Sequence, residues 1–156
     1  MTPPSVLIVG AGNAYRRDDG AGIAAVNRLG KLPADVRVLV AQGDAPSLLD
    51  EWPGADLVIL IDATMSGAAP GTIRRYDANA GSLPAVFSHS STHALGPGDV
   101  IELARQLRLL PARLVVFGIE GDDFRTGEGL SPAVDVAVNE VVATVSAMAS
   151  GVDPAG

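Results

Sequence analysis

The chain of 156 residues contains no cysteine, and only 4% of its residues are aromatic. The lack of cysteine excludes disulfide bonds and thiolate metal sites, and it is compatible with a reducing cytoplasm. Because aromatic rings are so few, the hydrophobic core has to consist mainly of valine, leucine, isoleucine and alanine side chains.

Basic residues are also few, with 11 lysines and arginines against 18 aspartates and glutamates, a net charge of −7. Such a chain repels phosphate backbones, so no nucleic-acid partner is expected. Hydrophobic residues make up 47% of the chain, but their longest runs are strand-length, which predicts no membrane span. Residues 1–5 carry no basic charge and lead directly into a predicted strand, unlike a signal peptide. We therefore expect a cytoplasmic monomer.

Apolar runs of strand length alternate with amphipathic segments, which predicts an α/β fold. The expected strands are nearly continuously apolar, as in sheets covered by helices on both faces, except for a more polar edge strand at 72–76. We expect a three-layer α/β/α sandwich around a mainly parallel five-stranded sheet, with the first and third strands adjacent. The predicted strands span 5–10, 36–41, 57–61, 72–76 and 114–119, and the predicted helices span 21–29, 45–52, 100–109 and 131–149.

One domain is expected over residues 1–150, followed by a flexible tail at 151–156. Residues 78–97 form a long segment containing serine, glycine and proline, and loops of that length are usually functional or disordered. We expect residues 78–92 to be mobile in the free protein, because they offer few apolar anchors.

Three aspartates stand at the ends of predicted elements, where a carboxylate can have either a structural or a catalytic role. Asp62 comes directly after a buried strand, where its carboxylate needs either a structural partner or a bound ligand. Asp18 and Asp19 precede Gly20 at a helix start, where acidic residues often cap free N–H groups. Two adjacent aspartates cannot both cap in the same geometry, so one of them is left for another role.

The only two histidines are His89 and His93. Their spacing suits one helix face, but the serines and threonine between them and Gly96-Pro97-Gly98 beyond them disfavour a helix. A two-histidine zinc helix also lacks its glutamate here. Because the carboxyl ends of parallel strands meet in one crevice, one histidine joining two aspartates fits a divalent-metal site better.

Other catalytic and binding motifs are absent or incomplete. The chain has no Gly-x-Ser-x-Gly elbow and no phosphate-binding loop with lysine. Gly10-Ala11-Gly12 begins like a dinucleotide fingerprint, but Tyr15 stands where the third glycine is required. These glycines also have a structural interpretation, since they allow a tight turn and close approach to a neighbouring strand. Asn13 is suited to hold the same loop through a side-chain hydrogen bond.

An ordered set of motifs resembles the nickel-hydrogenase maturation endopeptidases, the family that trims the C-terminus of the hydrogenase large subunit. The resemblance covers nearly the whole chain. Its motifs are Gly10-Ala11-Gly12-Asn13, Asp18-Asp19-Gly20-Ala21-Gly22, Ile61-Asp62-Ala63, Pro70-Gly71-Thr72, Ser91-Thr92-His93-Ala94-Leu95-Gly96, Gly118-Ile119-Glu120 and Gly129-Leu130-Ser131-Pro132.

The resemblance implies a metal-contacting and catalytic trio of Asp19, Asp62 and His93 in an aspartyl endopeptidase-like enzyme. It implies that the metal is nickel supplied by the precursor substrate, and another divalent metal could occupy the same site. The partner would be the hydrogenase large-subunit precursor. The chain departs from the family after its second strand, where Gln42-Gly43-Asp44-Ala45 replaces a Gly-Gly-Thr-like turn, and this bears on substrate preference.

Two other functions stay open from the sequence. The first is a non-catalytic Rossmann-like module that docks on a metalloprotein, and the second is a self-sufficient zinc hydrolase. Cleavage of the precursor distinguishes the first, and metal analysis of the purified protein distinguishes the second.

Overall fold

The computed structural model describes residues 5–84 and 95–153. Its five-stranded sheet has the order β2-β1-β3-β5-β4. All neighbouring strands are parallel except β4, which pairs antiparallel with β5 at one edge. The expected sheet, its edge strand and the adjacency of the first and third strands are confirmed. The strands are β1 (Val6–Gly12), β2 (Val36–Gln42), β3 (Leu57–Thr64), β4 (Ile73–Asp77) and β5 (Leu114–Glu120).

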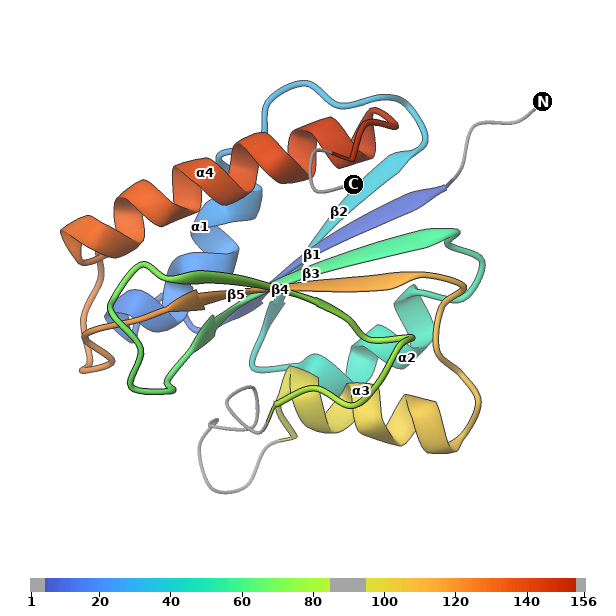
Figure 1. Ribbon diagram of the computed structural model, residues 1–156, viewed down its shortest axis with the longest axis horizontal. Helices are drawn as coiled ribbons and strands as arrows, with labels where there is room; N and C mark the ends of the chain where they lie inside the picture. Colours follow the sequence, from blue (N-terminus) through green and yellow to red (C-terminus); the bar gives the residue numbers. More distant parts are fainter. Residues whose placement is uncertain (1–4, 85–94, 154–156) are drawn as a thin grey trace.

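Helices cover both faces of the sheet and complete the predicted three-layer sandwich. In Figure 1, α1 and α4 lie on one side of the strands, and α2 and α3 lie on the other. The helices are α1 (Ala21–Asn27), α2 (Leu48–Glu51), α3 (Pro97–Gln106) and α4 (Pro132–Ala149), and the short 3₁₀ helices η1 (Arg17–Gly20) and η2 (Ala45–Ser47) precede α1 and α2.

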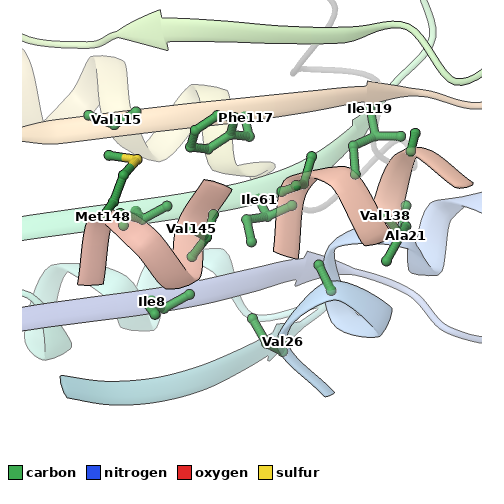
Figure 2. Close-up of a cluster of buried hydrophobic side chains, with 14 of the residues drawn as sticks. Ile8, Ala21, Val26, Ile61, Val115, Phe117, Ile119, Val138, Val145 and Met148 are labelled. Atoms are coloured by element: carbon green, nitrogen blue, oxygen red, sulfur yellow. The ribbon is translucent and has the colours of Figure 1, made fainter. Parts of the chain in front are cut away.

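The two faces of the sheet form two hydrophobic clusters, because successive side chains of a strand point to opposite sides. Figure 2 shows Val145 and Met148 of α4 beside β5, with Phe117 and Ile61 in the same cluster. The other cluster includes Leu60, Trp52 and Ile101. Strands that are apolar on both faces therefore sit between two helical layers, as the sequence predicted.

α1 lies unusually close to the sheet because of Gly22. A Cβ atom there would lie 2.1 Å from the carbonyl oxygen of Ile61 and 2.6 Å from that of Ala11. Only glycine permits this approach, which brings the start of α1 against the ends of β1 and β3.

Two local expectations were wrong. Gly96-Pro97-Gly98 does not interrupt a helix but begins α3, because proline fits the first turn and the Gly96 N–H donates to the Asp99 carboxylate at 3.0 Å. β2 is not covered on both faces, since Val38 and Val40 are 44% and 43% exposed. The reason is that β2 is an edge strand and the short α1 packs mainly on β1 and β3.

α4 is long and apolar enough to cross a membrane by length and composition, which the sequence interpretation did not anticipate. Its buried residues pack in the core beside α1 and β5, and core helices pass the same test.

After α4, the Asp153 carboxylate accepts hydrogen bonds from Arg75 at 2.7 and 2.6 Å and from Arg113 at 3.0 Å. The domain boundary at residue 150 stays a prediction.

Candidate active site

Asp62 lies inside β3, which runs three residues further than the sequence predicted. Its side chain points to the same face as Leu60, and the residue is only 2% exposed. The carboxylate atom Oδ1 accepts a hydrogen bond from the N–H of Ala63 at 2.9 Å. A nearly buried carboxylate at the carboxyl end of a central strand is a costly arrangement that function commonly explains.

Asp19 is brought beside Asp62 by Gly12, the last residue of β1. A Cβ atom at Gly12 would lie 2.0 Å from the Asp19 carbonyl oxygen and 3.8 Å from Asp62 Oδ1. The Asp19 carbonyl also accepts a hydrogen bond from the Asn13 N–H at 3.1 Å. Asp19 is 7% exposed, so η1 places a second nearly buried aspartate at the same edge of the sheet.

The loop between β1 and η1 is held by its own side chains. Asn13 Oδ1 accepts a hydrogen bond from the Tyr15 N–H at 2.9 Å, which confirms the role expected for this asparagine. An Arg16 guanidinium nitrogen lies 3.9 Å from Asp19 Oδ2, with the Arg16 side chain 36% exposed. A positive charge therefore stands next to one of the two carboxylates.

Asp18 does not cap its own helix, contrary to the expectation of a cap at the helix start. It is fully buried, and its carboxylate accepts hydrogen bonds from the N–H groups of Asp122, Asp123 and Ser131 and from the Ser131 hydroxyl. The two adjacent aspartates thus have different surroundings: Asp18 holds the loop between β5 and α4, whereas Asp19 lies in η1 where that short helix packs against β3.

Glu120, at the end of β5, is a second buried carboxylate with a supporting role. It accepts hydrogen bonds from the Thr64 hydroxyl at 2.8 Å, from the Ser66 hydroxyl at 2.7 Å and from the N–H groups of Ser66 and Gly67. It fixes the turn that follows β3. Glu120 belongs to the motif Gly118-Ile119-Glu120, but sequence reasoning gave its side chain no role. Like Asp62, it comes directly after a predicted buried strand, and that signal would have found it.

Burial and hydrogen bonding have opposite effects on the pKa values of the two supporting carboxylates, Asp18 and Glu120. Burial raises the pKa of Asp18, but the bonds from Ser131, Asp122 and Asp123 outweigh it and leave the pKa below 3.8. Burial also raises the pKa of Glu120, but the bonds from Ser66, Thr64 and Gly67 leave it below 4.5. Both groups are therefore charged at neutral pH.

His89 and His93 lie outside the described residues, so the histidine of the predicted trio has no position here. Within residues 5–84 and 95–153, no three His, Cys, Asp or Glu side chains are arranged to hold a metal ion. Asp19 and Asp62 alone supply oxygen ligands that suit a divalent cation, and the described part of the chain adds no third. The trio stays a prediction, and its two aspartates both adjoin Gly12.

Two other predicted segments can be placed. Gln42 is paired with Gly12, so the atypical turn at Gln42-Gly43-Asp44 adjoins the site. The segment expected to have few anchors begins with buried Ala78, and the Asn79 amide bonds to the Pro111 carbonyl and the Leu114 N–H. Its first residues are thus anchored, and residues 85–92 lie outside the described part.

Comparison with known proteins gives consistent matches. The family model for hydrogenase maturation proteases, HycI, matches residues 23–148. The hydrogenase expression/formation protein HupD of Rhodobacter capsulatus is 34% identical over 154 residues, covering 90% of this chain and 70% of HupD. The corresponding protein HoxM of Azotobacter vinelandii is 30% identical over 154 residues, covering 88% and 72%. Among solved structures, the hydrogenase maturating endopeptidase HybD from Escherichia coli has a TM-score of 0.79 and 27% identity, covering 95% and 94%.

Proposed function

This chain belongs to the hydrogenase maturation protease family and is a peptidase, and on that premise we propose that it removes the C-terminal extension from the precursor of a nickel-containing hydrogenase large subunit. The observation that carries the proposal is the pair of nearly buried aspartates, Asp19 and Asp62, beside Gly12. Family membership also removes the alternative of a non-catalytic docking module.

Nickel enters this proposal as part of the substrate. The precursor would present its metal to Asp19, Asp62 and His93, whose oxygen and nitrogen atoms are suitable ligands for a divalent ion. Two carboxylates and one imidazole form an incomplete ligand shell. The free enzyme would therefore bind metal weakly, and a loaded precursor would complete the shell. This arrangement supports recognition of the inserted metal.

The same carboxylates can take part in hydrolysis. One aspartate, nearly buried at the end of β3 or in η1, can accept a proton from the attacking water as the scissile carbonyl is polarised. Burial makes a charged carboxylate costly, so a cation presented by the substrate next to it strengthens substrate binding. Asp18 and Glu120 support this geometry by fixing the neighbouring loops.

Incubation of the enzyme with nickel-loaded and metal-free precursor tests the proposal. We expect release of the C-terminal peptide, detected by mass spectrometry, from the loaded precursor alone. Equal cleavage of the metal-free precursor would contradict recognition of the metal. No cleavage of either form would contradict the proposed substrate. The purified enzyme should contain less than one equivalent of zinc, whereas tight stoichiometric zinc would favour a self-sufficient zinc hydrolase.

We also propose that the enzyme works as a monomer in the cytoplasm, which its lack of cysteine is compatible with. Light scattering of the purified protein and fractionation of cells test the two parts separately. A dimer, or recovery outside the cytoplasmic fraction, would contradict the respective part.

A further inference from the structure

We propose that Arg74 binds a carboxylate of the protein substrate in an open hollow beside Asp62. This inference rests on the proposed function, because it assigns a substrate-binding residue next to the same site. Arg74 belongs to the antiparallel edge strand β4, and it is exposed to solvent.

The register of the sheet places Arg74 and Asp62 in one row. Asp62 is paired with Gly118 of β5, and Gly118 is paired with Arg74 of β4. Residues in direct register have side chains on the same face, and two strand spacings separate their backbones by about 10 Å. Because Gly118 has no side chain, that row carries no side chain between the carboxylate and the guanidinium.

The neighbours of Arg74 confirm which face it occupies. Tyr76, two residues along, packs against the cluster that contains Leu60. Arg75 points to the other face, where its guanidinium lies 5.8 Å from the centre of the Phe117 ring and pairs with Asp153. Arg74 therefore points to the face of Asp62.

The hollow next to Arg74 has a volume of about 440 Å³ and is lined by Thr64, Ser66, Tyr76 and Pro84, among others. This volume is within the roughly 300–1,000 Å³ typical of ligand pockets. Thr64 lies two residues beyond Asp62 on the same face, so the hollow begins where the site ends. Its wall at Ser66 is fixed by the hydrogen bonds to Glu120.

Arg74 also differs from most arginines in this acid-rich chain. Arginines at eight positions form ion pairs with carboxylates: Arg16, Arg17, Arg28, Arg37, Arg75, Arg105, Arg113 and Arg125. Among the described residues, no carboxylate or carbonyl pairs with the Arg74 guanidinium, although it lines a hollow beside the site. A guanidinium binds a carboxylate through two parallel hydrogen bonds. The ligand is therefore an acidic side chain near the scissile bond or the terminal carboxylate of the precursor.

Cleavage kinetics and precursor binding test this role. Arg74→Gln should raise KM and the Kd for uncleaved precursor about tenfold with little change in kcat, as expected for lost ground-state binding. Arg74→Lys should recover part of the affinity. Arg108→Gln is the matched control: Arg108 is exposed and lies in the connection from α3 to the start of β5, whereas Asp62 pairs near the other end of that strand, so this variant should behave as wild type. Unchanged KM and Kd in Arg74→Gln would overturn the proposal.

Precursor variants identify the carboxylate. One set replaces each acidic side chain of the C-terminal extension and its flanking residues by the amide, and another carries an amidated C-terminus. The variant that lacks the recognised carboxylate should weaken binding to wild type but not further weaken binding to Arg74→Gln. Additive losses for every precursor variant would overturn the proposal. The binding measurement decides the role of Arg74 even where the precursor is not cut, an outcome that would contradict only the proposed function.

Discussion

The Ser131 N–H and hydroxyl both donate hydrogen bonds to the carboxylate of Asp18, each at 2.7 Å, across 113 positions of the chain. Ser131 immediately precedes α4, whereas Asp18 immediately precedes Asp19. The contact therefore ties the start of the longest helix to the segment that presents a candidate metal ligand. Loss of the contact would affect both fold stability and the position of Asp19.

Asp18→Asn should lower the free energy of unfolding by about 3 kcal/mol, because an amide cannot accept all the hydrogen bonds that the buried carboxylate accepts. This is more than a helix cap alone would contribute, about 1 kcal/mol. Urea denaturation measures the difference. The control is Asp122→Asn, an exposed neighbour whose replacement should change stability by less than about 0.5 kcal/mol. Equal effects of the two substitutions would contradict the role of Asp18.

Stability should fall with acidification below about pH 5. The pKa values of Asp18 and Glu120 lie below 3.8 and 4.5 in the folded protein, so at lower pH the unfolded chain binds protons that the folded chain does not. Their contribution is therefore complete above the unfolded values and is lost as pH falls through the folded ones. Urea unfolding from pH 6 to 3 measures the slope, with 0.5 M salt added to screen surface pairs such as Asp123–Arg125. Glu120→Gln should make the slope shallower, and an unchanged slope would contradict the assignment.

Gly22→Ala should destabilise the protein by about 3 kcal/mol, since its Cβ atom would meet two backbone carbonyls that cannot move without displacing β1 or β3. Gly30→Ala is the matched control, because no atom lies within 4 Å of a Cβ atom at that position. Thermal melts of both variants check the expectation. Similar melting temperatures would mean that α1 can shift away from the sheet at little cost.

Much of the fold could be predicted because its strands are apolar on both faces and its helices begin at recognisable residues. Ser131-Pro132 marked the start of α4, and the structure confirms it. The end of β3 could not be predicted from the apolar run, because Asp62 is polar and yet belongs to the strand. Exposure of Val38 and Val40 depends on how far a short helix extends over an edge strand, which periodicity does not report.

The candidate site was only partly predictable. Sequence reasoning selected Asp19 and Asp62, and in the structure the Asp19 carbonyl and the Asp62 carboxylate both adjoin Gly12, although their role stays a prediction. It could not identify the role of Asp18, because the partners of this carboxylate lie more than a hundred residues further along the chain. Likewise, Arg74 appears beside Asp62 only through strand register, which a local pattern does not contain.

Asp62→Asn should abolish precursor processing and leave the fold intact. The amide keeps the shape and can still accept the hydrogen bond from Ala63, but it lacks the charge that a cation requires. Loss of residues that merely support metal ligands commonly costs 10–100-fold, so loss of a ligand should cost at least about a hundredfold. Asp19→Glu, which keeps its carboxylate, should stay active. Processing rates and thermal melts measured together decide the matter, and cleavage by Asp62→Asn at a normal rate would contradict the metal site.

The two histidines should respond differently to substitution. His93→Ala should abolish processing without lowering the melting temperature, because the resemblance assigns the nitrogen ligand to His93, and imidazole is the nitrogen donor that divalent metals prefer. His89→Ala serves as its control and should process the precursor at the wild-type rate. Calorimetry of cadmium binding to the free enzyme adds a readout that does not depend on cleavage. Cadmium binding should weaken in His93→Ala but not in His89→Ala. If His89→Ala is inactive and His93→Ala is active, the ligand has been assigned to the wrong histidine.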